Sequence, residues 1–200
     1  MRLDAWLQRV WYSKARPPAW LRALAALYGA VMRLRAALYA RGWLKSVRVG
    51  VPVIVVGNVT VGGTGKTPLT IWLAQALRGL GYRVAVVSRG YGRRAAWGTL
   101  RVKPSSSAEE VGDEPLLIHR RAGCPVFVDG DRVRAARAAI AAGAQLVIAD
   151  DGLQHLRLAR DAEIIAVDAQ RGLGNGGLLP AGPLREPASR LGRATAVVLT

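Results

Sequence analysis

The chain has 200 residues, 51% of them hydrophobic, which suffices for one globular domain with an appended element. Lys and Arg total 29 against 13 Asp and Glu, for a formal charge of +16, so an anionic partner is expected. No helix-turn-helix, zinc-finger or RNA-recognition signature occurs, so a membrane surface or a phosphorylated substrate is favoured over nucleic acid. The single Cys124 excludes an internal disulfide and a cysteine-based zinc cluster.

The first 46 residues are predicted to form an N-terminal amphipathic segment. A first helix is expected over Met1–Ser13 and a second over Pro18–Arg41. The second helix carries an apolar stripe at spacings of three and four, formed by Trp20, Leu24, Leu27, Val31, Leu34 and Leu38. Its longest uncharged run, Ala23–Met32, is shorter than the roughly 17–25 residues that cross a bilayer, so no transmembrane helix is predicted. The helix either lies in a membrane interface or packs its stripe on the domain, and both alternatives can hold on different faces of the helix.

From Val51 onward, short apolar runs alternate with helical patterns. The expected strands are Val51–Gly57, Tyr82–Ser88, a short Thr99–Val102, Cys124–Asp129, Gln145–Asp150, Glu163–Asp168 and Thr195–Thr200, and the expected helices are Lys66–Leu80, Glu114–Ala122 and Asp131–Ala142. Apolar strands separated by helices indicate a mostly parallel sheet with helices on both faces. Residues 47–200 are therefore predicted to form an α/β core of the P-loop NTPase type. Ligands of such sheets bind beyond the carboxyl ends of the strands.

A glycine-rich stretch, T-V-G-G-T-G-K-T, lies between the first of these strands and the next helix. It has the pattern of a phosphate-binding P-loop, in which glycines let consecutive N–H groups surround an anion at a helix N-terminus. Lys66 is predicted to contact the β- and γ-phosphates of ATP, and the Thr67 hydroxyl to contact Mg²⁺. The predicted nucleotide-binding residues are Thr60, Val61, Gly62, Gly63, Thr64, Gly65, Lys66 and Thr67. The usual pattern begins with Gly, and this chain has Thr60 there.

A second motif, L-V-I-A-D-D over Leu146–Asp151, is an apolar strand that ends in two acids. Such a strand is typical of a Walker B site, in which Asp150 or Asp151 would hold Mg²⁺ directly or through water. His155 follows in the next loop and is the histidine expected near phosphate.

The remaining motifs supply acids and cations. Asp113 begins a helix, where it either caps the helix or accepts the proton of an acceptor hydroxyl. Arg132 begins another helix just past a strand end, and Arg185 is the cation of the long Gly- and Pro-rich loop Arg171–Pro187. The loop Ser88–Arg93 (S-R-G-Y-G-R) either binds phosphate, shapes a substrate entrance or is solvated.

Together these motifs resemble one family, the tetraacyldisaccharide 4′-kinases of lipid A biosynthesis. The resemblance rests on G-N-V-T-V-G-G-T-G-K-T-P, S-R-G-Y-G-R, V-G-D-E-P, A-D-D-G-L-Q-H and L-L-P-A-G-P-L-R-E-P, in this order. It implies transfer of the ATP γ-phosphate to the 4′-hydroxyl of a lipid-linked acylated glucosamine disaccharide 1-phosphate, at the cytoplasmic face of the bacterial inner membrane. The implied location is peripheral, on the anionic membrane surface.

The resemblance also implies roles for the matched residues. Asp113 is the catalytic carboxylate, Lys66 and Thr67 contact phosphate and Mg²⁺, and Asp150 and Asp151 are metal-site acids. His155, Arg132 and Arg185 support them. The family's chains continue into a C-terminal lobe, whose histidine partners the catalytic Asp. The resemblance places that lobe beyond Thr200, so this chain is expected to bind Mg-ATP and to transfer phosphate poorly or not at all.

Two alternatives remain. A membrane-attached regulatory P-loop ATPase would often carry a second Lys before the paired glycines, and Val61 is there instead. An inactive ATP-binding fragment is the other alternative. A GTPase is disfavoured because no Asn-Lys-x-Asp motif occurs. The sequence does not predict the oligomeric state or the acyl-chain preference.

Overall fold

The structure is a computed structural model that describes residues 3–13, 15–93 and 98–200. Met1 and Arg2, where the first helix is predicted to begin, lie outside the described residues. The chain divides into two compact units. The first unit comprises Met1–Leu44, Asn58–Thr64 and Ile165–Thr200, and the second comprises Lys45–Gly57 and Gly65–Ile164. The boundary predicted between residues 46 and 47 divides an amphipathic segment from a P-loop core, which is a division by role and not by compact unit. This boundary stays a prediction.

The second unit is built on a mostly parallel sheet, as predicted. Strands β1 (Val53–Gly57), β5 (Leu146–Asp150), β2 (Val84–Ser88) and β4 (Val126–Val128) pair in parallel in that order. The short β3 (Leu100–Arg101) pairs antiparallel with β4, and β6 (Ala162–Val167), whose first half belongs to this unit, follows β1. All residues of β2, β4 and β5 are buried, which explains why their sequences are apolar up to Ser88 and Asp150 at the ends of β2 and β5.

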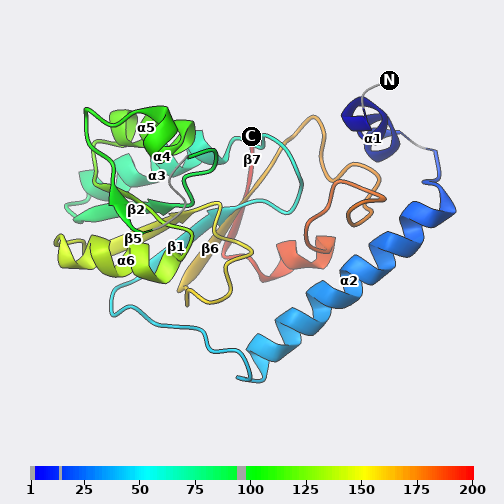
Figure 1. Ribbon diagram of the computed structural model, residues 1–200, viewed down its shortest axis with the longest axis horizontal. Coiled ribbons are helices and arrows are strands. Elements are labelled where there is room, and N and C mark those ends of the chain that lie inside the picture. Colours follow the sequence, from blue (N-terminus) through cyan, green and yellow to red (C-terminus); the bar gives the residue numbers. More distant parts are fainter. Residues whose placement is uncertain (1–2, 14, 94–97) are drawn as a thin grey trace. The chain divides into compact units, whose positions relative to one another are not determined.

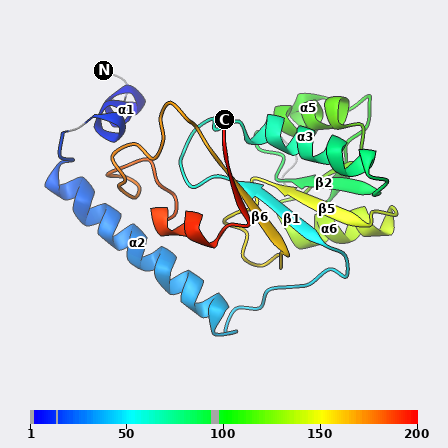
Figure 2. The same cartoon turned by 180° about the vertical axis from the view of Figure 1, so that it is seen from behind.

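Helices cover both faces of this sheet (Figures 1 and 2). Helices α3 (Lys66–Gly79) and α5 (Asp113–Ala122) pack against each other over one face, and α6 (Arg132–Ala141) packs on β2 and β4 over the other. Asp131 caps α6, since its side chain accepts from Val133 N at 3.0 Å. The sequence patterns do not predict α4 (Ala108–Val111), a single turn that begins in a capping box at Ser107.

The first unit contains α1 (Leu3–Tyr12), α2 (Ala19–Ala40), the second half of β6, a 3₁₀ helix η1 (Ala188–Arg193) and β7 (Ala196–Leu199). Its core consists of Leu21, Ala25 and Ala181, with Trp6, Val10 and Leu178 packed against them. Trp11 Nε1 also donates to Pro180 O at 2.9 Å. Residues from both ends of the sequence therefore build this unit together.

Helix α2 buries a different face from the predicted apolar stripe. Leu21, Ala25 and Gly29 are buried, and a Cβ on Gly29 would lie 2.8 Å from Leu178 Cδ1. Five of the six stripe residues are exposed by 47% to 63%, namely Trp20, Leu24, Leu27, Val31 and Leu34, and Leu38 is half-buried. Of the two alternatives for the stripe, the structure favours the one in which it does not pack on the protein.

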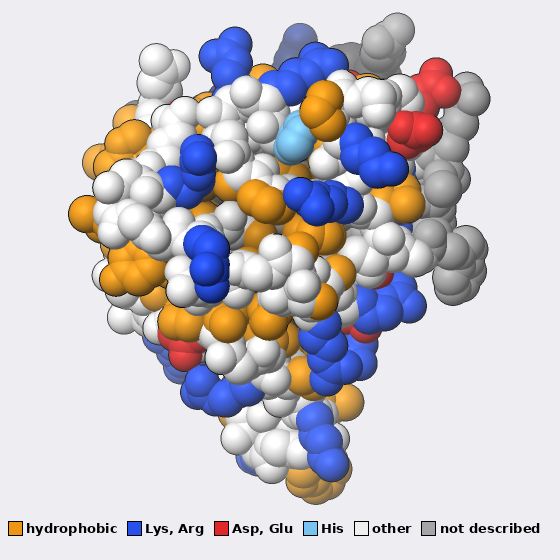
Figure 3. Space-filling view, turned by 90° about the vertical axis from the view of Figure 1, so that its left-hand side faces the viewer, with side chains coloured by type: hydrophobic (Ala, Val, Ile, Leu, Met, Phe, Trp, Pro, Cys, Tyr) orange, Lys and Arg blue, Asp and Glu red, His pale blue; other side chains and the backbone are white. Residues whose placement is uncertain are grey.

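Basic side chains are spread over the face of the molecule that Figure 3 draws. Figure 3 shows Lys and Arg scattered among apolar side chains on the face it draws, with acidic side chains in few places. On this face the positive charge is thus distributed over the surface and is not concentrated in one patch.

Candidate functional site

The chemistry-bearing motifs of the second unit gather at one edge of its sheet. In the parallel register Val56 pairs with Asp150, and Ser88 pairs with Val128, so the carboxyl ends of four strands lie together. The residues that follow these ends include Arg89, Asp129 and Asp151. This edge is where ligands of parallel α/β sheets bind.

The P-loop is one continuous stretch of chain that passes from the first unit to the second between Thr64 and Gly65. Gly65 is the N-cap of α3 with a φ of 63°, and Gly62 has a φ of 112°. Both values lie in the region that glycine adopts at little cost. A Cβ on Gly62 or Gly63 would meet nothing within 4 Å, so this side of the loop is open to a ligand.

The start of the P-loop pairs with the loop that carries Arg185. Thr60 forms an antiparallel bridge with Leu184, and Val61 N donates to Pro183 O at 2.8 Å. Arg185 N donates to Val59 O at 2.7 Å, and the Tyr28 hydroxyl donates to Arg185 O at 2.8 Å. The first unit thus brings together two motifs that lie more than a hundred residues apart in the sequence.

The two acids that end β5 differ in their surroundings. Asp151 is partly exposed, with its Oδ1 3.7 Å from Lys66 Nζ. Asp150 is buried and accepts from the Thr70 hydroxyl at 2.9 Å. Burial raises the pKa of Asp150 to about 6, against the opposing effect of the Thr70 hydrogen bond. Asp150 is therefore a carboxylate held out of water beside the cation of the P-loop.

Thr70 is the site residue that sequence reasoning missed. It lies one helical turn after Lys66 on the buried face of α3, among Leu69, Leu73 and Ala74. A polar residue on a buried helix face usually has a hydrogen-bond partner. The position of Thr70 among apolar residues was therefore the sequence signal for a buried hydrogen bond. The partner is nonlocal, however, and only the packing of α3 on β5 identifies it as Asp150.

Arg132 is a buried cation with unused hydrogen-bonding capacity. Its exposed fraction is 2%, and Nη1 donates to Asp129 O at 2.9 Å. Nε is buried and has no hydrogen-bond partner among the described residues. Burial, followed by repulsion from Arg89, lowers the pKa of Arg132 to about 10, so the guanidinium is charged at neutral pH. Such a group is suited to a phosphate oxygen.

Asp113 is exposed and begins α5, but the N-cap is Gly112 and no side-chain capping bond forms. Gly112 has a φ of 91°, and a Cβ on it would lie 2.7 Å from Tyr91 O. A Cβ on Gly90 would lie 2.9 Å from Val111 O. The loop Ser88–Arg93 is therefore packed against the segment that leads into Asp113.

The loop beyond β5 is held by backbone contacts. His155 is half-buried, and its N–H donates to Gly152 O at 2.9 Å. The Arg160 guanidinium donates to the carbonyls of Leu153, His155 and Leu158. The structure therefore fixes the position of the His155 backbone, and the role of the imidazole stays a prediction.

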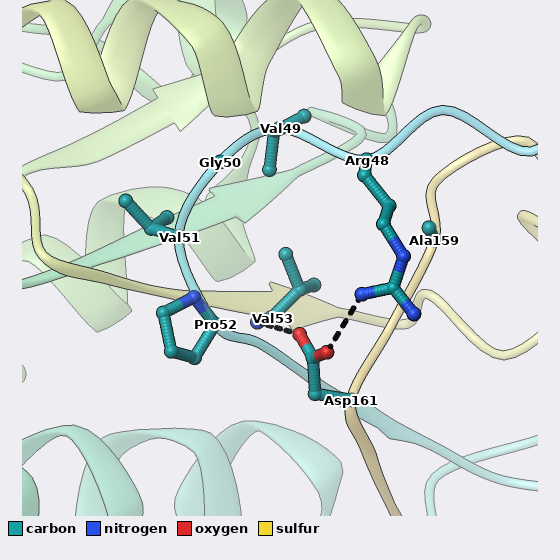
Figure 4. Close-up of a pocket in the computed structure, with 8 residues that line it drawn as sticks. All are labelled: Arg48, Val49, Gly50, Val51, Pro52, Val53, Ala159 and Asp161. Atoms are coloured by element: carbon teal, nitrogen blue, oxygen red, sulfur yellow. Dashed lines mark hydrogen bonds and ion pairs between the residues drawn. The ribbon is translucent and has the colours of Figure 1, made fainter.

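A separate cavity of about 320 Å³ lies at the amino end of β1, within the second unit. Figure 4 shows Asp161 there, accepting from Val53 N at 2.9 Å and from Arg48 Nη1 at 3.1 Å. This end of the strands is opposite to the one that carries the motifs. We therefore assign the cavity no part in the site.

Within the described residues, no three His, Cys, Asp or Glu side chains gather in a way that would hold a metal ion by themselves. A hard cation such as Mg²⁺ commonly takes one or two carboxylates and completes its shell with phosphate and water. The oxygens of Asp150, Asp151 and Thr67 are of the type that Mg²⁺ prefers.

Comparison with known proteins agrees with this architecture. The sequence profile of the family described as tetraacyldisaccharide-1-P 4′-kinase matches residues 18–200. Relatives named tetraacyldisaccharide 4′-kinase include one from Alkalilimnicola ehrlichii, 56% identical over 92% of this chain and 56% of its own length. Another, from Xanthomonas euvesicatoria, is 59% identical over 90% of this chain and 52% of its own length.

A solved structure of LpxK from Aquifex aeolicus in complex with ATP superimposes with a TM-score of 0.81 at 40% identity, covering 89% of this chain and 57% of that one. The chain thus spans a little over half the length of the relatives it matches. Its sequence motifs, P-loop fold and similarity to these proteins lead to one conclusion: the chain belongs to the tetraacyldisaccharide 4′-kinase family.

Proposed function

We propose that the chain is the nucleotide-binding part of an ATP-dependent kinase. The whole kinase transfers the γ-phosphate to the 4′-hydroxyl of a lipid-linked acylated glucosamine disaccharide 1-phosphate, and forms the lipid IVA-type precursor of lipid A. The observation that carries the proposal is the cluster of Lys66, Asp150 and Asp151 within the second unit. Family membership supplies the acceptor.

Each residue has a proposed role in phosphoryl transfer. The P-loop from Thr60 to Thr67 binds the triphosphate, and Lys66 and Arg132 stabilise the negative charge on the transferred group. Mg²⁺, held by Thr67 and by Asp150 or Asp151, would neutralise charge on the β- and γ-phosphates. Asp113 accepts or orients the proton of the acceptor hydroxyl.

His155 and Arg185 support this arrangement. The Asp151 carboxylate beside Lys66 keeps that ammonium at the P-loop. Asp150 is held by Thr70, and its burial maintains a site from which water is partly excluded. These features strengthen electrostatic interactions with a bound triphosphate, because such interactions are stronger away from water.

The decisive experiment follows labelled γ-phosphate from ATP. A kinase transfers the label to a lipid extract, whereas a regulatory ATPase releases it as free phosphate, and an inactive fragment does neither. The assay uses this chain and the same chain joined to the C-terminal region of the Alkalilimnicola ehrlichii relative, called the extended chain below. Release of free phosphate without any labelled lipid, by both forms, would overturn the kinase assignment.

We further propose that the protein works at the cytoplasmic face of the inner membrane as a peripheral protein. The exposed stripe of α2 supports contact with the membrane interface. By length and composition α2 is also the one helix in the described chain that could cross a bilayer, with 11% of its apolar window buried. Its three arginines, Arg22, Arg33 and Arg35, favour the interfacial orientation.

Vesicle sedimentation tests this placement. Replacing Leu24 and Leu27 by Asp should reduce binding to anionic vesicles and leave the melting temperature unchanged, because both residues are exposed. Leu21→Ala, on the buried face, is the matched control and should lower the melting temperature by removing core packing. Extraction of the wild-type protein by high salt distinguishes peripheral attachment, and resistance to salt and carbonate would support a spanning helix instead.

A further inference from the structure

A polar groove of about 570 Å³ lies in the first unit between the last turns of α1 and the loop after β6. Its lining includes two arginines and four neutral polar side chains, Arg9, Arg171, Gln8, Tyr12, Ser13 and Gln170. None of the described residues that line it is acidic. We propose that this groove binds the phosphate of a membrane phospholipid headgroup.

The loop that forms one wall of the groove is fixed by backbone hydrogen bonds. Asp168 Oδ1 accepts from Gln170 N and Arg171 N, both at 2.9 Å. Asn175 Nδ2 donates to Val10 O at 3.2 Å, and Asn175 N donates to Trp11 O at 2.8 Å. The Asp168 carboxylate therefore binds its own loop, and Asn175 ties the end of that loop to α1.

Because of this attachment, the loop after β6 and helix α1 are in close contact at Gly174. A Cβ on Gly174 would lie 2.7 Å from Trp11 O, which shows how closely the loop approaches the helix. The groove is consequently built before any ligand arrives, so little ordering of the backbone opposes binding.

The two cations of the groove are of the type that suits phosphate. Arg171 lies over the Tyr12 ring, with 5.9 Å between the guanidinium carbon and the ring centroid. Arg9, in the last turn of α1, also lines the groove. Guanidinium groups bind phosphate through pairs of parallel hydrogen bonds, and the side chains of Gln8, Gln170, Tyr12 and Ser13 add neutral donors. The lining therefore matches an anion with several acceptor oxygens.

The surroundings of the groove favour a lipid over free phosphate. Trp6 of α1 stacks on Trp20 of α2, with ring centroids 6.2 Å apart and planes at 4°. Trp20 begins the exposed apolar stripe, and α1 lies beside that end of α2 in both ribbon views (Figures 1 and 2). A helix that lies in the interface with this stripe among acyl chains holds α1 at the level of the headgroups. Free phosphate would gain nothing from the stripe.

The test is calorimetry with dihexanoyl phosphatidic acid, which is soluble below its micelle concentration and so removes the general attraction of a charged membrane. A saturating non-hydrolysable ATP analogue occupies the P-loop. The Arg9→Gln/Arg171→Gln variant should bind at least tenfold more weakly than wild type. The matched control, Arg120→Gln/Arg137→Gln, removes the same charge from exposed positions of the second unit and should bind as wild type does.

Several outcomes would overturn the proposal. Equal weakening in the control variant means general charge attraction, and equal affinity for inorganic phosphate means a site for free phosphate. Competitive inhibition of acceptor phosphorylation by the short-chain lipid means that the groove belongs to the acceptor. If the double variant does not fold, Tyr12→Leu keeps the charge, removes the ring under Arg171 and should still weaken binding. The readout is lipid binding, so it is independent of the proposed kinase activity.

Discussion

The buried carboxylate of Asp150 makes the stability of the protein depend on pH. Its folded pKa of about 6 lies above the ordinary value of 3.8, so the folded state holds this proton more tightly than the unfolded state does. The stabilisation is complete below about pH 4 and is lost as the pH rises through 6. The free energy of unfolding therefore falls by about 3 kcal/mol over this range from Asp150 alone.

Asp150→Asn should remove this loss. In metal-free protein at pH 7.5 the variant should be more stable than wild type by about 3 kcal/mol, and by roughly half of that at pH 5. Urea unfolding at the two pH values measures the difference. The same pH dependence in both proteins would show that Asp150 titrates normally.

Asp113 gives a second prediction at a single residue, since the structure shows no capping bond from its side chain. If it handles the acceptor proton, Asp113→Asn in the extended chain should lower kcat at least about a hundredfold and leave ATP affinity unchanged. Asp131→Asn, at the start of α6, is the control, because Asn caps as well as Asp and kcat should not change. An unchanged kcat for Asp113→Asn would mean that Asp113 has a structural role and does not act in catalysis.

Among elements, the close approach of two loops at Gly112 has a measurable cost. Ala at this position would be strained by the positive φ and would also meet Tyr91 O. Gly143 has a φ of 93°, and a Cβ added there would meet nothing within 4 Å, so Gly143→Ala introduces backbone strain without a steric clash. Gly112→Ala should therefore destabilise the protein by about 1–3 kcal/mol more than Gly143→Ala. Equal melting temperatures for the two variants would contradict the close packing.

The elements themselves were largely predictable from the sequence, because their signals are local. Helix α3 ends within one residue of the predicted Lys66–Leu80, since Gly79 and Gly81 lie at its end. The burial of α2 was not predictable, because its buried face contains the small residues Ala25 and Gly29 beside Leu21, while most of its stripe residues are exposed. Pairings such as Thr70 with Asp150, Tyr91 with Gly112 and Thr60 with Leu184 join distant segments, and no local pattern encodes them.

At the scale of the whole molecule, nucleotide binding should stabilise the fold. Mg-ATP at a hundred times its Kd should raise the free energy of unfolding by about 2.7 kcal/mol, because it binds only the folded state. Lys66→Met should abolish this gain, and Lys103→Met, at an exposed position, should keep it. Thermal unfolding with and without Mg-ATP measures both. Full stabilisation of the Lys66→Met protein by Mg-ATP would show that the P-loop is not the nucleotide-binding site.

The interleaving of the two units also governs the order in which the protein can fold during translation. Leu21 leaves the ribosome early, but its core partner Ala181 follows 160 positions later, a delay of about 10–30 s at ordinary rates of synthesis. The second unit is nearly contiguous and ends at Ile164, so it can fold first while α1 and α2 are still without their partners. During that interval Leu178 and Ala181 do not yet cover the buried face of α2, and its stripe is exposed, so we expect nascent chains to contact the membrane before the first unit closes. Cross-linking of ribosome-bound chains of increasing length to lipid would measure this, and contact that begins only after residue 185 has emerged would refute it.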